Sequence, residues 1–311
     1  MTTSASVSAF AAPDGTLLAH RSHGSGDPLV CVPGGPADSA YLGDLGGLSA
    51  HRRLIVMDLR GTGRSGVPRD TSSYRSDRLV DDIEALREHL GLHRIDLLAH
   101  SAGANPAMQY AARYPERVGR LALITPGTRA VGTVITGETR RELARLRAGE
   151  PWFPAAFAAL EALIAGTGGD RDAIAPFFYG RWDDGARRHH AAGRPDNPEA
   201  VARFGAEGAF DPQATRAGLA ALRAPVLLLA GEFDLNSPPR SVAACAELFP
   251  DATLVVQRGA GHYPWLDDAD RFVAATAAFL ACDRALPLPA ARCLWRAARH
   301  PHPPVRPPCV R

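Results

Sequence analysis

Short apolar runs alternate with stretches of helical periodicity over most of the chain. Six runs have the length and residue content of buried strands, and they occupy residues 28–32, 54–59, 94–99, 120–125, 225–231 and 252–257. Before them, residues 7–21 have the pattern of a hairpin that turns at Asp14 and Gly15. Strands that alternate with helices predict a mostly parallel central sheet flanked by helices on both faces.

Helix signals mark the connections between these strands. Residues 76–91 are amphipathic, and we expect Ser76 to cap the start of this helix and Gly91 to end it. Between about residues 127 and 215 the alternation breaks, because the chain becomes rich in Ala, Arg and Glu with helical periodicity. A helical insertion between two strands of one sheet is the simplest interpretation.

These patterns divide the chain into four parts. We expect the first part of an α/β core at residues 1–126, a helical cap insertion at 127–215 and the second part of the core at 216–283. Residues 284–311 are rich in Pro and Arg and contain no acidic residue. Prolines at that density prevent a continuing helix, so we expect a disordered tail.

Composition narrows the possible partners and chemistry. The formal net charge is only +2, which gives no global reason to expect a nucleic-acid or membrane partner. All 35 residues in the Lys and Arg count are Arg, which excludes mechanisms that need a Schiff-base amine or a P-loop lysine.

Cysteine usage and the N-terminal sequence bear on the compartment. The five cysteines are scattered and form no C-x-x-C pair, so neither a disulfide framework nor a thiolate metal site is indicated. The first ten residues lack the charged and apolar regions of a signal peptide, and no apolar run is long enough to span a membrane. We therefore expect a cytoplasmic protein.

A glycine-rich stretch at residues 61–66, "GTGRSG", matches the pattern of a dinucleotide-binding turn. Such a turn needs a helix that opens at its third glycine and an acidic residue at the end of a second strand, about 20 positions on. Here Gly66 is followed by loop residues, and Asp81 and Asp82 lie within the next predicted helix. We therefore expect these glycines to shape a loop, without a nucleotide cofactor.

The segment "LLAHSAGANPA" places Ser101 between a buried strand and an amphipathic helix. A strand, a sharp turn and a helix form a nucleophile elbow, in which the central serine stands above the sheet on a strained backbone. Ala99 occupies the first position of the usual G-x-S-x-G pattern and is small enough to be accommodated there. Ser101 is the candidate nucleophile.

The partners of a catalytic serine follow in the expected chain order. Asp234 comes just after one predicted strand, and His262 lies in the loop after the next. Because the carboxyl ends of parallel strands meet at one edge of a sheet, Ser101, Asp234 and His262 are candidates for a triad. After the strand at 28–32, a Gly-Gly turn can aim main-chain N–H groups at an oxyanion, and we assign that role to Gly35 and Ala102.

Together, "PGGP", "DLRGTGRS", "AHSAG", "GEFD" and "GAGH" occur in the order found in α/β-hydrolases, and the chain resembles their proline iminopeptidase branch over roughly residues 5–282. The resemblance implies an α/β-hydrolase fold with a helical cap over the pocket. It also implies that "DLRGTGRS" is a structural loop beside the active site. Iminopeptidases usually have His where this chain has Pro33, and some relatives carry a further acid where Leu235 stands.

The same resemblance suggests how a substrate amine could be bound. Iminopeptidases hold the free amine with carboxylates from the cap, one of them near a tryptophan. By that resemblance, Trp182, Asp183 and Glu207 are candidate substrate-binding residues.

Several histidines fall outside this scheme. His89 and His93 have the spacing of two metal ligands on a helix, but Gly91 between them indicates a helix end, so no metal site is expected. His189 and His190 are adjacent and would point apart on a helix. For His100, which precedes Ser101, we expect a packing role. Tyr263 and Trp265 fit either the pocket or the core.

The sequence therefore predicts a serine hydrolase that cleaves an ester or amide of a small molecule or short peptide without metal or organic cofactor. A carboxylesterase or lactonase and a cofactor-free perhydrolase fit the same three side chains. A ligand-binding sensor on the same fold is the non-enzymatic alternative.

Overall fold

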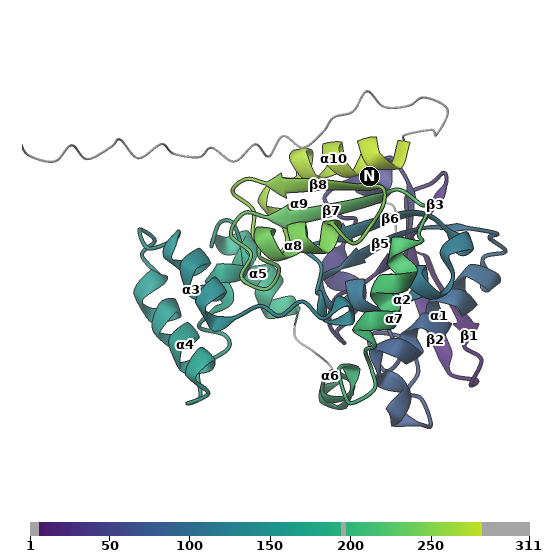
Figure 1. Ribbon diagram of the computed structural model, residues 1–311, viewed down its shortest axis with the longest axis horizontal. Helices are drawn as coiled ribbons and strands as arrows, with labels where there is room; N and C mark the ends of the chain where they lie inside the picture. Colours follow the sequence, from purple (N-terminus) through teal and green to yellow (C-terminus); the bar gives the residue numbers. More distant parts are fainter. Residues whose placement is uncertain (1–5, 194–196, 282–311) are drawn as a thin grey trace, which may run out of the picture. The chain divides into compact units, whose positions relative to one another are not determined.

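An eight-stranded sheet runs through the computed structural model, which describes residues 6–193 and 197–281 (Figure 1). The strand order is β1-β2-β4-β3-β5-β6-β7-β8, and all neighbouring strands from β4 to β8 pair in parallel. The strands are β1 (Ser6–Ala11), β2 (Leu17–His23), β3 (Pro28–Val32), β4 (Arg53–Met57), β5 (Ile95–His100), β6 (Val118–Ile124), β7 (Val226–Gly231) and β8 (Ala252–Gln257). The six runs expected from the sequence are all strands of this sheet, but β8 is only partly buried where the sequence predicts a buried strand, because it lies at the edge of the sheet.

The hairpin at the edge of the sheet also follows its sequence signal. Strands β1 and β2 are antiparallel, with Ala9 opposite Ala19. The turn between them uses Asp14, whose carboxylate accepts from the N–H of Thr16 at 2.9 Å, and Gly15, whose φ is +80°. Glycine takes such a positive φ without steric cost, which explains the turn residues.

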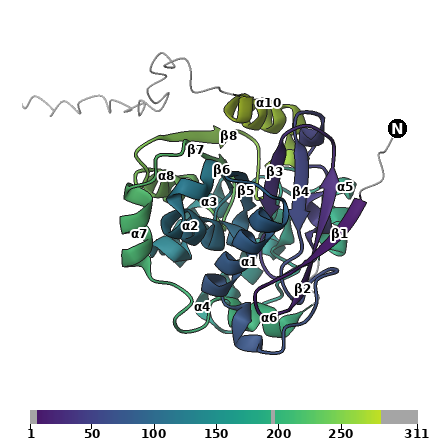
Figure 2. The same ribbon diagram turned by 90° about the vertical axis from the view of Figure 1, so that its right-hand side faces the viewer.

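Alternate strand residues supply two separate apolar cores, one on each face of the sheet. Val30, Leu97 and Leu228 belong to the core on one face, together with residues of α1, α2, α7 and α8. Cys31 and Leu98 belong to the other core, which α10 covers (Figures 1 and 2). The helices that cover the sheet are α1 (Ser76–His89), α2 (Ala104–Arg113), α7 (Pro212–Ala220), α8 (Pro239–Ala246), α9 (Pro264–Asp267) and α10 (Ala269–Ala281).

The insertion between β6 and β7 is helical, as the sequence predicts. It contains α3 (Gly137–Arg145), α4 (Phe153–Ala165), the 3-10 turn η7 (Ala175–Phe178), α5 (Asp184–Ala192) and α6 (Pro198–Phe204). Ala144, Ala156, Leu160 and Phe177 form an apolar cluster inside the insertion. Leu235 packs into the same cluster from the loop after β7, so the insertion contacts the core next to Asp234.

One local expectation about α1 is wrong. The cap position of this helix is Arg75, and Ser76 is its first residue, whose hydroxyl donates to Gln109 Oε1 at 2.7 Å. The interhelical bond to α2 therefore takes the hydroxyl that the sequence assigned to capping. The end of the helix follows the prediction, since Gly91 comes directly after the last turn with a φ of +65°.

The glycine-rich stretch at residues 61–66 forms a loop between β4 and the 3-10 turn η3 (Thr71–Tyr74). Asp58 explains the glycine at position 63, where φ is +53° and a Cβ would come within 2.6 Å of the buried carboxyl carbon. The same carboxylate accepts from the N–H of Arg64 at 3.0 Å. The next helix begins only at Ser76, so these glycines do not open a helix as a dinucleotide-binding turn requires.

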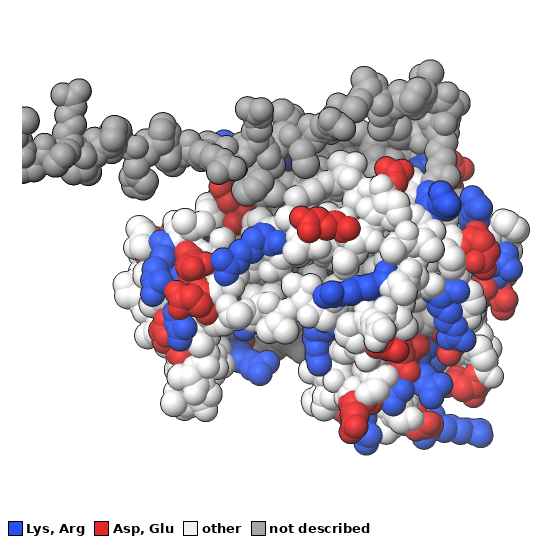
Figure 3. Space-filling view, viewed as in Figure 1, with Lys and Arg blue, Asp and Glu red and all other residues white. Residues whose placement is uncertain are grey.

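Residues 284–311, for which the sequence predicts a disordered tail, lie outside the described residues. In the part of the chain that is described, no helix is both long and apolar enough to cross a membrane. On the face shown in Figure 3, acidic and basic side chains are interspersed, in keeping with the low net charge.

Candidate active site

Ser101 stands at the junction of β5 and α2, and its backbone is strained. Its φ is +52°, a value that non-glycine residues rarely adopt. The 3-10 turn η4 (Ser101–Gly103) leads directly into α2. A Cβ on Gly103 would come within 2.1 Å of the carbonyl oxygen of Pro33, so only glycine allows this turn to pack against the loop after β3. The sequence prediction of a sharp turn at Ser101 is thus confirmed.

The structure brings Ser101, His262 and Asp234 together in one hydrogen-bonded chain. Nε2 of His262 lies 2.8 Å from Ser101 Oγ, and Nδ1 of His262 lies 2.7 Å from Asp234 Oδ2. Asp234 is fully buried, and its other oxygen accepts from the N–H of Asn236 at 2.8 Å. Because a carboxylate oxygen accepts, the imidazole proton lies on Nδ1, and the lone pair of Nε2 faces the serine hydroxyl.

The Gly-Gly turn after β3 lies directly against Ser101. A Cβ on Gly34 would come within 2.7 Å of Ser101 Cβ, and Gly35, with a φ of +46°, lines the pocket above the serine. The N–H of Gly34 donates to the Tyr41 hydroxyl at 2.6 Å, which leaves Gly35 as the nearby donor assigned from the sequence. Ala102 is the second residue of η4, a turn whose first N–H groups have no acceptor within the helix.

A buried network that the sequence did not predict holds the backbone of His262. His100, expected only to pack, places Nε2 2.9 Å from the main-chain oxygen of His262, and the Thr125 hydroxyl donates to that oxygen at 3.0 Å. Nδ1 of His100 lies 2.7 Å from the Tyr41 hydroxyl. Burial, with a smaller contribution from His262, holds the pKa of His100 well below its usual value, so this imidazole is neutral.

The loop that carries His262 is also tied to the insertion. The N–H of His262 donates to the carbonyl of Phe178 at 2.7 Å. Asp267 accepts from the N–H of Gly180 at 2.8 Å and from that of Gly261 at 2.7 Å, so one carboxylate connects both segments. Burial raises the pKa of Asp267 to about 6 in spite of these two bonds. The position of the imidazole thus depends on the insertion as well as on the sheet.

A pocket with a volume of about 220 Å³ opens above Ser101, and we call it the Ser101 pocket. It is walled by the Gly-Gly turn, the His262 loop and the insertion. Its described lining residues are Gly34, Gly35, Ala37, Tyr41, His100, Ser101, Phe178, Tyr179, His189, His190, Gly193, Asn236, His262 and Tyr263. No Asp or Glu is among these described residues, so the pocket offers aromatic, imidazole and amide groups to a substrate.

The candidate amine-binding residues lie elsewhere on the insertion. Asp183 is exposed and caps α5, where its Oδ1 accepts from the N–H of Ala186 at 3.0 Å. Trp182 packs against Tyr179, with ring centroids 5.4 Å apart. Glu207 is exposed, and its main-chain oxygen accepts from Arg75. None of the three is among the described residues that line the Ser101 pocket, and their role in binding an amine remains a prediction.

The other histidines lie in two regions, His89 and His93 at or just after the end of α1 and His189 and His190 on α5. His89 ends α1 and stacks on Phe10 with centroids 5.4 Å apart, while His93 lies beyond Gly91. His189 and His190, although adjacent on α5, both line the Ser101 pocket. Within residues 6–193 and 197–281, no group of three or more His, Cys, Asp or Glu side chains is arranged to hold a metal ion.

Two known proteins are similar to this chain over most of its length. A 31% identical relative, the N-formylmaleamate deformylase of Pseudomonas putida, aligns over 84% of this chain and 91% of its own length. A solved esterase of Thermogutta terrifontis has 27% identity and a TM-score of 0.66 over 89% of this chain and 98% of that one.

Other relatives align over a shorter region. A proline iminopeptidase of Heyndrickxia coagulans is 34% identical over 33% of this chain and 36% of its own length. The chain thus spans little more than a third of that relative. Residues 27–269 match the family described as alpha/beta hydrolase fold. The chain therefore belongs to the alpha/beta hydrolase fold family.

Proposed function

We propose that this protein is a serine hydrolase that cleaves small carboxylic esters through an acyl-enzyme. The observation that carries the proposal is the chain of two hydrogen bonds from Ser101 through His262 to Asp234. In the proposed mechanism, Nε2 of His262 takes the hydroxyl proton as Ser101 Oγ attacks the ester carbonyl. Asp234 orients the ring and stabilises the imidazolium that forms.

The remaining steps use groups near the same serine. The N–H groups of Gly35 and Ala102 stabilise the oxyanion of the tetrahedral intermediate. His262 then returns its proton to the leaving oxygen, and the carbonyl re-forms as the acyl-enzyme. A water molecule, deprotonated by His262, attacks this acyl group, so that the carboxylic acid leaves and Ser101 regains its proton.

The choice of esters over free-amine peptides rests on the pocket. An ammonium group bound next to the scissile bond needs a carboxylate partner, because a buried unpaired charge costs several kcal/mol. No Asp or Glu is among the described residues of the Ser101 pocket. The relatives include a protein named as a deformylase and a solved protein named as an esterase, and both names fit acyl transfer to water.

The test combines covalent labelling with turnover. Wild-type protein should be labelled by a fluorophosphonate and should hydrolyse p-nitrophenyl acetate, and Ser101→Ala should lose the labelling and about 10⁴-fold or more of the turnover. Unchanged turnover in Ser101→Ala would refute the proposal. Stabilisation by a ligand without product would indicate a sensor, and peroxide-dependent chemistry at the same serine would indicate a perhydrolase.

A further inference from the structure

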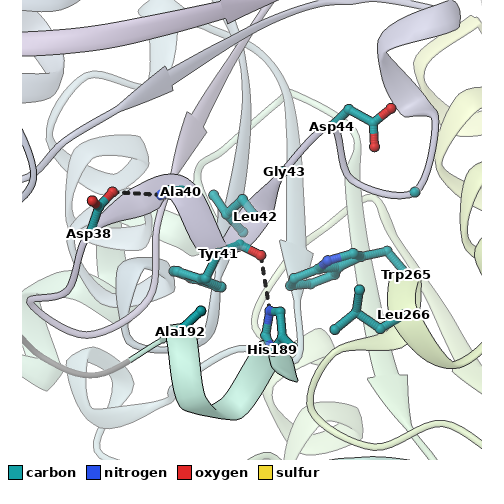
Figure 4. A pocket seen from close by; sticks show the side chains of 11 residues that line it. Asp38, Ala40, Tyr41, Leu42, Gly43, Asp44, His189, Ala192, Trp265 and Leu266 are labelled. Carbon is teal, nitrogen blue, oxygen red and sulfur yellow. Dashed lines mark hydrogen bonds between the residues drawn. The ribbon is translucent and has the colours of Figure 1, made fainter. Parts of the chain in front are cut away.

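A second pocket lies beside the Ser101 pocket, and the two share a wall. We call it the α5 pocket; its volume is about 400 Å³ (Figure 4). Its described lining residues are Asp38, Ala40, Tyr41, Leu42, Gly43, Asp44, Gly46, His189, Ala192, Trp265 and Leu266. Among these described lining residues, Tyr41 and His189 are the two that line both pockets. These two side chains therefore stand between the space at Ser101 and the space beyond it.

His189 is held in this wall at both ring nitrogens. Nε2 lies 3.0 Å from the main-chain oxygen of Tyr41, and Nδ1 lies 2.8 Å from the Tyr179 hydroxyl (Figure 4 draws the bond to Tyr41). Because a carbonyl only accepts, Nε2 carries the proton and Nδ1 accepts from the hydroxyl. The ring also packs edge-on against Tyr263, with centroids 4.6 Å apart. The His189 ring is thus held in place between the two pockets.

Tyr41 has a different role in the same wall. Its hydroxyl binds both Gly34 and His100, so it belongs to the support of the nucleophile and the glycine turn. Changing Tyr41 would therefore disturb the chemistry, whereas His189 contacts Tyr41 only through the main-chain oxygen and ring packing. The His189 side chain can therefore be removed without loss of a hydrogen bond to Gly34, His100 or Ser101.

Size and chemistry suggest what the α5 pocket would take. The Ser101 pocket, at about 220 Å³, is smaller than the about 300–1,000 Å³ typical of small-molecule sites, and the α5 pocket falls within that range. Leu42, Trp265 and Leu266 give it apolar walls. An apolar chain that continues from a carbonyl at Ser101 would gain the favourable free energy of burial there.

The two carboxylates of the α5 pocket do not change this expectation. Asp38 pairs with Arg21 at 2.9 Å and accepts from the N–H of Ala40, while Asp44 accepts from the N–H of Gly47 at 3.1 Å. Both already have protein partners, so neither requires a cation from a substrate.

From this arrangement we infer that His189 sets the length of the acyl chain that the enzyme accepts. The inference rests on the proposed ester hydrolysis. With His189 in place, the acyl group is confined to the Ser101 pocket and short chains are preferred. Without its side chain, the two pockets join, and a linear acyl chain extends past Tyr41 into the α5 pocket toward Trp265 and Leu266.

The test is a chain-length profile of kcat/KM with p-nitrophenyl acetate, butanoate, hexanoate, octanoate and decanoate. Wild-type protein should prefer the short esters. His189→Ala should raise kcat/KM for the octanoate about tenfold or more, the scale that apolar contacts with a substrate chain can supply. His190→Ala is the matched control, because His190 lines only the Ser101 pocket; its profile should keep the wild-type maximum.

A second variant separates an opened wall from a loosened fold. Ala192 lines the α5 pocket but not the Ser101 pocket, so Ala192→Phe added to His189→Ala should block the new space and restore the preference for short chains. A wild-type preference for octanoate, or an unshifted profile in His189→Ala, would overturn the inference.

A binding measurement distinguishes this inference from the proposed function. In the Ser101→Ala background, methyl octanoate should raise the Tm more when His189→Ala is also present, and methyl acetate should show no such difference. If wild-type protein hydrolyses no ester, the proposed ester hydrolysis is wrong. The Tm comparison decides the further inference separately: a larger Tm increase with methyl octanoate in the His189→Ala variant supports the joined pockets, and an equal increase refutes them.

Discussion

The Tyr41 hydroxyl lies 2.7 Å from Nδ1 of His100 and accepts from the N–H of Gly34 at 2.6 Å. Since the Gly34 N–H can only donate, the hydroxyl proton points to His100, and the proton of His100 lies on Nε2, which faces the carbonyl of His262. A single buried chain of hydrogen bonds thus joins the glycine turn to the backbone of His262.

Tyr41→Phe should therefore weaken catalysis without changing the shape of the pocket. The variant leaves the N–H of Gly34 without its acceptor, and we expect kcat to fall about tenfold, equal to about 1.4 kcal/mol, at little change in KM. Steady-state kinetics on a short ester measure the split. Tyr263→Phe is the control, because it removes a hydroxyl of the same pocket with no described hydrogen bond; an equal loss in both variants would contradict the role of Tyr41.

Asp234→Asn should move the proton of the neutral His262 imidazole from Nδ1 to Nε2. Asparagine can keep the bond from the N–H of Asn236 through its oxygen, but its amide then faces Nδ1 as a donor. The ring would carry its proton on Nε2, toward Ser101, and lose its function as a base. We expect kcat to fall about 10⁴-fold with the fold intact. A drop of less than about tenfold would show that His262 does not depend on this carboxylate.

Asp267 should make the unfolding free energy depend on pH. Its pKa is raised from 3.8 to about 6, so the folded protein holds this proton more tightly than the unfolded chain. The protonated carboxyl of Asp267 therefore makes its full contribution to the free energy of unfolding below about pH 4. This contribution, at most about 3 kcal/mol, is lost as the pH rises to about 6.

Urea denaturation of wild-type protein and Asp267→Asn across this pH window measures the difference. The variant has no carboxyl proton to lose. As the pH rises from about 4 to about 6, the free energy of unfolding of wild-type protein should therefore fall relative to that of the variant. Parallel curves would show that the carboxyl of Asp267 titrates normally.

Two glycines should respond differently to the same substitution. Gly103→Ala would place a Cβ 2.1 Å from the Pro33 oxygen, and we expect a loss of about 3 kcal/mol or more in the free energy of unfolding. Gly91→Ala enters open space at a φ of +65° and should cost about 1–2 kcal/mol from the backbone conformation alone. Similar losses, measured by denaturant titration, would argue against the close approach at the elbow.

Free-amine recognition can be tested at the residues that the resemblance suggested. Asp183→Asn with Glu207→Gln keeps a good capping residue on α5, so stability should be unaffected. Because neither side chain lines the Ser101 pocket, we expect KM to change by less than about twofold for prolyl anilides and for N-blocked esters alike. An increase in KM confined to the free-amine substrates would instead support an iminopeptidase.

Features with a local cause could be predicted from the sequence. The strands follow from apolar runs of the right length, and the turn at Ser101 follows from a strand that meets a helix across small residues. The grouping of Ser101, Asp234 and His262 followed from chain order, because the ends of parallel strands meet at one edge of a sheet. Gly91 ended its helix for the same kind of local reason.

Features that depend on contacts between distant segments were decided only by the tertiary structure. The Ser76 hydroxyl binds Gln109 on another helix and does not cap its own helix. For Tyr41, Thr125 and Asp267, no nearby sequence pattern indicates the atoms that they bind. The pocket shows the same limit: His189 enters it and Asp183 does not, because the packing of α5 on the core selects which side chains face Ser101. Periodicity and turn chemistry act over a few residues, whereas the shape of a pocket depends on how the insertion and the sheet fit together.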